Sequence, residues 1–250
     1  MSLRYLWPIL AVISTAAAVA GFTAAYRLYL RACALQLDPP GRGHVSTAPR
    51  RPTGKVVVFF GDSRAAQWIA PESGSDITFV NRGIAGQTTA QILGRFEAHV
   101  AALSPDIVVV QAGSNDLKCI PLFPDRAEAI ERNCVENLRE IVTRSVDSGA
   151  TVILTTIFPH GRIPLYRRPF FDSRVTEATK RVNEELRRLI SPRVIVLDTW
   201  PILAGADGLV RPEFERDLLH LTPVGYAALN ARLVPVLTDV TFATTDRRIE

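Results

Sequence analysis

The sequence predicts an α/β fold in which helices cover both faces of a parallel sheet. Three observations indicate this. Short runs of apolar, mostly β-branched or aromatic residues recur along the chain, and a segment with helical character follows each run. The runs are apolar without alternation, which is typical of strands buried on both faces. At 250 residues with 47% apolar content, the chain is long enough for one such domain plus an additional segment.

Five strands are expected, and helices separate them. The expected strands are residues 56–60, 76–81, 106–113, 151–158 and 193–199. The expected helices begin near Arg64, cover 89–103, 125–148 and 173–190, and begin again at Pro223. Ligands of such folds bind at the carboxyl ends of the strands. The residues that directly follow the strands are therefore the first candidates for a functional site.

The N-terminus contains an apolar segment that the sheet does not need. Residues 5–26 carry no charged side chain, and Arg4 precedes them. As a helix this segment extends about 33 Å, which is enough to cross the hydrocarbon core of a bilayer. Trp7 and Tyr26 stand where aromatic side chains lie at membrane interfaces. The sequence predicts one transmembrane helix that remains as an anchor. A cleaved signal peptide is the alternative, because small residues at 18–21 and 32–34 are typical of cleavage sites.

A polar segment separates this helix from the sheet. Residues 38–55 contain four Pro and three Gly, a composition typical of a tether. The predicted organisation is an anchor or signal segment at 1–31, a linker at 32–54, a folded domain at 55–240 and a flexible tail at 241–250. Arg27, Arg31 and Arg42 would place the domain in the cytoplasm by the positive-inside rule. Because an N-terminal anchor before a globular body is typical of an export signal, we expect a periplasmic or extracellular domain.

Charge and composition exclude several function classes. The formal net charge is +4, and the basic residues are scattered without the basic and aromatic pattern of a nucleic-acid-binding surface. No set of side chains has the spacing of metal ligands, and no glycine-rich loop is suited to phosphate. A nucleic-acid partner, a metal and other cofactors are therefore not expected.

The first strand is followed directly by Gly61-Asp62-Ser63. A serine at the carboxyl end of a strand can act as a nucleophile, although Asp and Ser are also ordinary turn and helix-capping residues. The proposed helix near Arg64 would present its N-terminus, with a partial positive charge, to a developing anion. Catalysis would further require a base for the Ser63 hydroxyl and a group that orients this base.

His220 is the best candidate for that base. It lies three residues after Asp217 and just before Thr222-Pro223, which are typical of a helix start. In this turn the Asp217 carboxylate can bend back onto the imidazole. A solvated Asp and His in a loop is the alternative reading. His99 lies in a predicted helix.

Two further segments offer donors for an oxyanion. Residues 81–89, "NRGIAGQTT", carry Gly86 before a helix start, so its main-chain N–H can point into the crevice at the strand ends. Residues 111–116, "QAGSND", place the Asn115 carboxamide after the third strand. Ordinary turn chemistry explains each segment equally well when it is taken alone.

Together, these segments resemble the SGNH hydrolases, also called the GDSL-type esterase and lipase superfamily. The matching residues occur in the order of that family over about 160 residues: Gly61-Asp62-Ser63, Gly86, Gly113-Ser114-Asn115-Asp116 and Asp217-x-x-His220. The resemblance implies a flavodoxin-like three-layer α/β/α domain with strand order 2-1-3-4-5. It implies Ser63 as nucleophile, His220 as base and Asp217 as its orienting partner. It also implies an oxyanion hole formed by the N–H groups of Ser63 and Gly86 and by the Asn115 side chain.

The reaction implied by the resemblance is ester hydrolysis through an acyl-enzyme, without a cofactor. The Gly-x-Ser-x-Gly motif of the α/β-hydrolases is absent, which disfavours that family. SGNH hydrolases act on acetyl esters of sugars, on lipid esters and on thioesters. A member of the fold that binds a glycan or a protein without catalysis is a further alternative, which the presence of Ser63, His220 and both oxyanion segments disfavours.

Residues 158–171, after the fourth strand, carry the only local indication of substrate. His160, Arg162 and Arg167 are candidate substrate-binding residues there, suited to an anionic or glycan-bearing ester, whereas a solvated charged loop is the alternative. With a membrane anchor in the same chain, we expect deacetylation of an envelope glycan. A lipase or lysophospholipase-type esterase is the second interpretation. The sequence does not predict an oligomeric state.

Cys119 and Cys134 flank the segment after Asn115 and form a candidate disulfide. The bond would close a loop of about 15 residues and would persist only in an oxidising compartment. Cys134 also lies on the apolar stripe of a predicted helix, which is typical of a buried free cysteine. Both interpretations stay open, and the disulfide would accompany export.

Overall fold

The computed structural model describes residues 3–44, 54–72 and 77–246. Its contacts divide the chain into two units, Met1–Gly43 and His44–Glu250, which we describe separately.

The first unit is dominated by helix α1, Leu3–Leu37. Large apolar side chains along it, including Trp7, Val12 and Phe22, are exposed. The stretch Trp7–Leu37 is long and apolar enough to cross a membrane or to act as a signal anchor. The helix continues six residues beyond the predicted limit at 31, because residues 32–37 contain neither Gly nor Pro. It ends before Asp38-Pro39-Pro40, and a short 3₁₀ turn follows at Arg42–His44. Residues 45–53 of the predicted linker lie outside the described residues.

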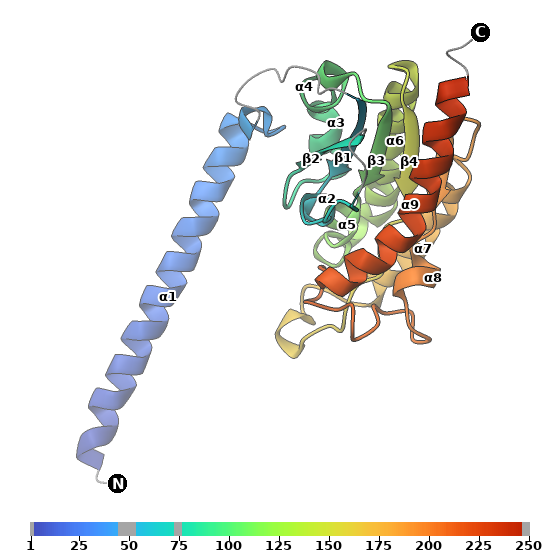
Figure 1. The fold of residues 1–250 in the computed structure, drawn as a ribbon. Helices are drawn as coiled ribbons and strands as arrows, with labels where there is room; N and C mark the ends of the chain where they lie inside the picture. The colour runs from blue at the N-terminus through green and yellow to red at the C-terminus, as the bar shows by residue number, and fades with distance from the viewer. Residues whose placement is uncertain (1–2, 45–53, 73–76, 247–250) are drawn as a thin grey trace. The chain divides into compact units, whose positions relative to one another are not determined.

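The second unit contains the predicted parallel sheet (Figure 1). Its strands are β1 Lys55–Gly61, β2 Ile77–Gly83, β3 Ile107–Gln111, β4 Thr151–Thr155 and β5 Val194–Leu197. Every pairing is parallel, and the order is β2-β1-β3-β4-β5, which confirms the expected order. Gly61 is paired with Gly83 and with Gln111, so three neighbouring strands end at the same level.

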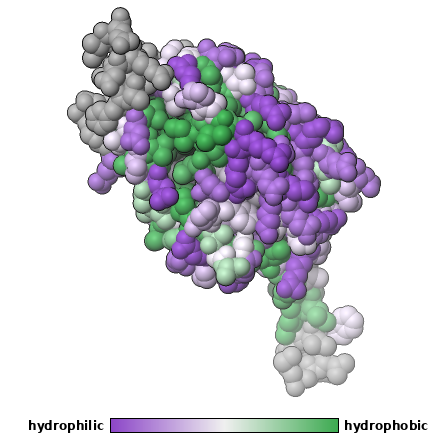
Figure 2. Space-filling view, turned by 90° about the vertical axis from the view of Figure 1, so that its right-hand side faces the viewer, coloured by the Kyte–Doolittle hydropathy of each residue, from purple (hydrophilic) through white to green (hydrophobic). Residues whose placement is uncertain are grey.

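Helices cover both faces of this sheet, which confirms the three-layer architecture. Alternate side chains of β1 enter two cores: Val56, Val58 and Phe60 pack on one face, and Val57 and Phe59 on the other. The first core is closed by α3 Thr89–Gly94, α6 Ala127–Asp147 and α7 Ser173–Arg187. The second is closed by α8 Trp200–Leu203 and α9 Pro223–Asp246. The outer surface on the side seen in Figure 2 is largely hydrophilic, with a hydrophobic area at its upper left.

Several helices differ from the prediction. The segment 89–103, expected as one helix, is divided into α3, α4 Phe96–His99 and a 3₁₀ turn at Ala101–Leu103. Arg95 lies at the break, with non-helical backbone angles. The short helices α5 Ser114–Leu117 and α8 were not predicted. Helix α9 continues to Asp246, six residues beyond the domain end expected at 240, and residues 247–250 lie outside the described residues.

Candidate active site

Ser63 is placed at the carboxyl edge of the sheet by a tight connection between β1 and α2, Ser63–Ala66. Asp62 is the N-cap of α2, and its Oδ1 accepts a hydrogen bond from the Arg64 N–H at 2.8 Å. Gly61 is required before it, because a Cβ at this position would lie 1.8 Å from the Gln111 carbonyl oxygen. The connection therefore places Ser63 at the end of the sheet, and it leaves no space for a side chain at Gly61.

The structure brings Ser63, His220 and Asp217 together. The His220 Nε2 atom lies 3.0 Å from the Ser63 Oγ atom. The His220 Nδ1 atom lies 2.8 Å from Asp217 Oδ1 and 2.9 Å from Oδ2. In the tautomer that donates from Nδ1 to the carboxylate, Nε2 has a free lone pair that can accept the Ser63 proton. This arrangement can generate a serine nucleophile.

Asp217 also shapes the turn that carries His220. Its Oδ1 atom accepts hydrogen bonds from the main-chain N–H groups of Leu219, at 2.9 Å, and His220, at 3.0 Å. Partial burial of the carboxyl group opposes ionisation, but these bonds and the His220 side chain together hold the pKa of Asp217 below its usual value. Asp217 thus remains a carboxylate next to the imidazole.

Arg64 is a further site residue that the sequence analysis missed. Its side chain is buried beside Ser63. The guanidinium donates to the carbonyl oxygens of Leu219 at 2.6 Å, Phe158 at 3.0 Å and Pro159 at 3.2 Å. It therefore ties the turn before His220 to the segment after β4. The only signal in the sequence was a basic side chain directly after Gly61-Asp62-Ser63.

Gly86 and Asn115 lie near the same edge of the sheet. Gly86 has a φ of 79°, a conformation that favours glycine. The buried Asn115 carboxamide donates one Nδ2 hydrogen to the Gln87 carbonyl oxygen at 3.0 Å, which links the Gly86 segment to α5. Lys118 donates to Asn115 Oδ1 at 2.5 Å. Because Oδ1 is thereby identified as the acceptor, the second Nδ2 hydrogen is the one that can serve an oxyanion.

Arg95 lies fully buried beneath the Gly86 segment. It donates to the carbonyl oxygens of Gly61 and Arg82, each at 2.7 Å, and to Gln87 Oε1 at 2.6 Å. Its Nη1 atom also lies 3.1 Å from His99 Nδ1, so His99 belongs to this buried network. Burial lowers the pKa of Arg95 to about 9. The helix break at Arg95 allows one side chain to join the ends of β1 and β2.

Two carboxyl groups, that of the buried Asp62 and that of the half-buried Asp116, lie near the site. Burial raises the pKa of Asp62 to about 6 and that of Asp116 to about 6. Asp116 accepts hydrogen bonds from the Thr89 main-chain N–H at 3.0 Å and from its hydroxyl at 2.7 Å. These bonds attach the start of α3 to α5.

His160, which is predicted to bind substrate, has no free ring nitrogen in this structure. The side chain is buried, with Nδ1 2.7 Å from the Gly161 carbonyl oxygen and Nε2 2.6 Å from Thr176 Oγ1, so both ring nitrogens are occupied. Arg162 forms ion pairs with Glu215 at 3.5 Å and with Asp207 at 3.9 Å. Arg167 is exposed and lies over the Tyr166 ring, 5.7 Å from its centroid. The structure therefore brings none of the three into contact with Ser63 or His220.

The candidate disulfide is also a correction, because Cys119 and Cys134 are both free. The Cys119 thiol points to the Asn115 carbonyl oxygen, at 3.3 Å. Cys134 is fully buried in the core, because α6 turns it toward the sheet. The argument for export that depended on this bond therefore falls away. In the described part of the chain, no group of three or more His, Cys, Asp or Glu side chains is arranged to hold a metal ion.

Comparison with known proteins identifies the family. Residues 58–228 match the model of the GDSL-like Lipase/Acylhydrolase family. The chain belongs to this family. It is 29% identical over 193 residues to platelet-activating factor acetylhydrolase IB subunit alpha1 of Bos taurus. The aligned region covers 73% of this chain and 76% of that protein. It is 31% identical over 86 residues to an arylesterase of Vibrio mimicus, over 34% of this chain and 39% of that protein.

Solved structures of the GDSL-like family share the fold. The crystal structure of a GDSL-like lipase from Bacteroides thetaiotaomicron aligns with a TM-score of 0.62 at 23% identity, over 80% of this chain and 98% of that one. Membership of the GDSL-like family makes this chain a hydrolase of esters.

Proposed function

We propose that Ser63, His220 and Asp217 form the catalytic triad of a serine esterase. The contact of His220 Nε2 with Ser63 Oγ at 3.0 Å, with Asp217 on the other ring nitrogen, is the observation that carries the proposal. Ser63 Oγ attacks the ester carbonyl carbon while His220 takes its proton. His220 then returns a proton to the alcohol that leaves. Water, activated by the same imidazole, attacks the acyl-enzyme and releases the acid.

The oxyanion of each tetrahedral intermediate would be held by three N–H groups. The main-chain N–H groups of Ser63 and Gly86 and the Asn115 carboxamide are the proposed donors. The buried bonds of Asn115 to Gln87 and Lys118 support this role, because they orient the carboxamide before substrate binds. Such donors stabilise negative charge without reorganisation during the reaction.

The acyl group we propose is acetyl, carried either by an envelope glycan or by a lipid. The glycan interpretation depended in part on His160 and Arg162, whose polar atoms are engaged within the protein. The lipid interpretation is favoured by a relative whose name is that of an acetylhydrolase of platelet-activating factor. Hydrolysis of an O-acetylated oligosaccharide, compared with that of a 1-alkyl-2-acetyl-glycero-3-phosphocholine at matched concentrations of acetyl ester, decides between the carriers.

The triad is tested by acetate release from p-nitrophenyl acetate. We expect Ser63→Ala and His220→Ala each to remove nearly all turnover. Ser173→Ala is the matched control, because Ser173 also begins a helix but is exposed on α7. Unchanged circular dichroism would show that the inactive variants are folded. Wild-type turnover in folded Ser63→Ala would refute the assignment.

We further propose that α1 anchors the chain in a membrane, with the hydrolase domain on the exported side. The length and apolar surface of Trp7–Leu37 support the anchor. An N-terminal anchor followed by a large domain is typical of an exported protein, although the arginines at 27, 31 and 42 would favour the opposite orientation. Digestion of the domain by protease added to spheroplasts, whose outer envelope has been removed, tests the side, and protection until the spheroplasts are lysed would reverse it.

A further inference from the structure

A protruding apolar and basic segment lies at the rim of the candidate active site. Within residues 164–170, Leu165 is 75% exposed, Tyr166 73% and Phe170 54%. Arg167 and Arg168 are exposed beside them, and neither forms an ion pair among the described residues. We call residues 164–170 the rim loop; it includes the 3₁₀ turn η5, Leu165–Arg167. Figure 1 shows this turn projecting at the edge of the domain where α2 and α5 lie.

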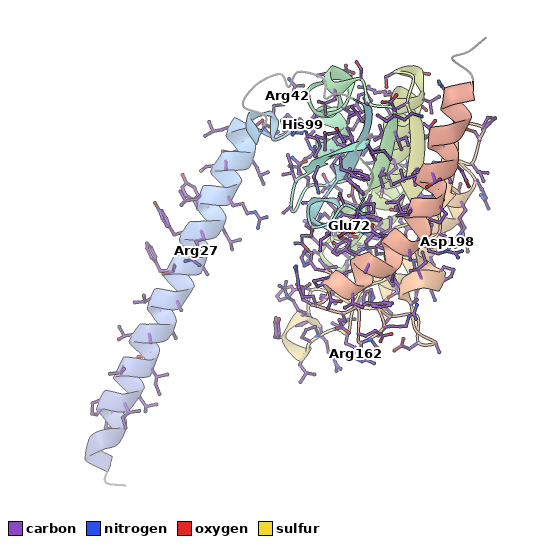
Figure 3. The ribbon with its side chains drawn as sticks, in the orientation of Figure 1. Arg27, Arg42, Glu72, His99, Arg162 and Asp198 are labelled. Carbon is purple, nitrogen blue, oxygen red and sulfur yellow. The ribbon has the colours of Figure 1, made fainter. Side chains whose placement is uncertain are left out.

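The base of the rim loop is attached directly to the turn that carries Asp217 and His220. The Gly161 N–H donates to the Leu218 carbonyl oxygen at 2.8 Å, and the Arg162 N–H donates to Glu215 Oε1 at 2.8 Å. Figure 3 shows Arg162 at this edge. Arg64, next to Ser63, holds the main chain just before the loop at Phe158 and Pro159. Whatever the rim loop contacts is therefore brought close to Ser63 and His220.

The other end of the rim loop is held by packing. Phe171 is buried against the His160 ring, with the two centroids 4.9 Å apart. His160 in turn contacts Thr176 of α7. The loop is thus fixed at both ends. Its large apolar side chains are nevertheless exposed, whereas Phe171, the next residue along the chain, is buried. Exposure of several large apolar side chains together is unusual for a surface that faces only water.

The composition of the rim loop fits the surface of a lipid bilayer. Leu and Phe favour the acyl boundary, Tyr is enriched at the membrane interface, and Arg binds lipid phosphates. A second exposed apolar pair, Leu122 and Phe123, lies at the end of η3, Ile120–Leu122, which comes after β3 at the same edge of the sheet. Both segments follow the carboxyl ends of neighbouring strands, β3 and β4.

We propose that the rim loop docks on the surface of an anionic bilayer, with Leu165, Tyr166 and Phe170 in the interface and Arg167 and Arg168 on lipid phosphates. The chain supplies an argument for this occupant, which relies on the anchor proposed above. Residues 38–54, between α1 and the domain, span at most about 60 Å even when fully extended. A bilayer that holds α1 is therefore always within reach of the domain. Docking would place the entrance of the active site next to the lipid phase.

The test places a fluorophore in the rim loop of the full chain, reconstituted in nanodiscs. Tyr166→Trp is made in a Trp7→Phe background, and brominated phosphatidylcholine in the disc quenches indoles that reach the interface. The parent Trp7→Phe chain corrects for Trp68 and Trp200. The control is Ile190→Trp in the same background, because Ile190 is 68% exposed but lies between α7 and the start of β5, at the opposite edge of the sheet.

We expect quenching at position 166, but not at position 190, in discs that contain phosphatidylglycerol. Arg167→Gln and Arg168→Gln should each lower the ratio of docked to undocked domain about fivefold, since each basic side chain near an anionic surface favours binding by that factor. Arg132→Gln and Arg139→Gln, exposed on α6, should leave it unchanged. Equal quenching at 166 and 190, or quenching that the rim-loop arginines do not affect, overturns the proposal. A soluble protein partner in place of the bilayer would leave position 166 unquenched.

Failure of the anchor is distinguishable from failure of the rim loop. If the chain leaves the discs in high-salt buffer, the anchor proposal is wrong. The same variants are then mixed with vesicles of the same lipid composition, and the contrast between positions 166 and 190 decides the docking proposal alone. None of these measurements depends on esterase activity.

Discussion

Arg64→Met is expected to weaken both the fold and the catalytic geometry. The guanidinium makes hydrogen bonds to three carbonyl oxygens, those of Leu219, Phe158 and Pro159. Methionine keeps much of the apolar stem, but it offers no donor and lacks the guanidinium that lies over the Phe158 ring, 5.2 Å from its centroid. The substitution therefore removes the bonds with little change in side-chain volume.

The magnitude follows from these contacts. A hydrogen bond from a charged donor contributes about 1.5–3 kcal/mol, and three of them would contribute well above that range. The cost of burying the charge offsets part of this sum, since burial lowers the pKa of Arg64. We expect the free energy of unfolding to fall by about 3 kcal/mol, a typical cost when one partner of a buried charged network is removed. A displacement of His220 by 1 Å would lower kcat about 100-fold.

Urea unfolding gives the stability, and release of p-nitrophenol from p-nitrophenyl acetate gives kcat and KM. Arg64→Lys should recover part of both, because one ammonium replaces some of the donors. Arg188→Met is the matched control, because Arg188 is exposed at the C-terminal end of α7 and pairs with Glu185 at 2.5 Å. Its effect should stay below about 1 kcal/mol. An Arg64→Met protein with wild-type kcat and unfolding free energy would refute the reasoning.

Three further predictions concern single side chains. Asn115→Ala should lower kcat about 100-fold in steady-state assays with little change in KM, because one oxyanion donor is lost; a change in KM alone would make Asn115 a binding residue. Asp217→Asn should retain more activity than Asp217→Ala, because its Oδ1 can still accept the N–H groups of Leu219 and His220; equal losses would assign the effect to charge alone. Burial raises the pKa of Asp62 to about 6, so the folded chain binds this proton more tightly than the unfolded chain. The free energy of unfolding should therefore fall by about 2 kcal/mol between pH 4 and pH 7 relative to Asp62→Asn, as measured by urea unfolding; parallel pH profiles would contradict this.

The strands were predictable because their signal is local. Continuous apolar runs such as Val56–Phe60 permit little except a strand buried on both faces. The segment 89–103 was misread for the opposite reason. Its apolar spacing favours one helix. The break at Arg95 instead allows this side chain to donate to the carbonyl oxygens of Gly61 in β1 and Arg82 in β2. Such long-range bonds leave no trace in a local window.

The same distinction separates the predicted site residues from the missed ones. Asp217 and His220 are three residues apart, so one turn brings them together, and the strand-end rule brings Ser63 to the same edge. Arg64 acts on carbonyl groups 94, 95 and 155 positions away. The disulfide predicted for Cys119 is wrong, and His160 is buried, because both were inferred without the neighbours that occupy their polar atoms.

Buried arginines explain how this site keeps its shape. Carbonyl groups in the segments that leave a sheet lack ladder partners, and a buried carbonyl without a partner is costly. One guanidinium carries five N–H donors and can satisfy several of them at once. Arg95 does this at the ends of β1 and β2, beneath the Gly86 segment, and Arg64 does it between the Phe158 segment and the turn of His220. The nucleophile segment thus touches both networks, through the Gly61 carbonyl oxygen and through Arg64 itself. Each arginine loses its hydration when it binds these carbonyls. If one segment moves away, a buried charge is therefore left without partners, which is costly. The order of the oxyanion segment and of the His220 turn is thus coupled to the fold of the whole domain.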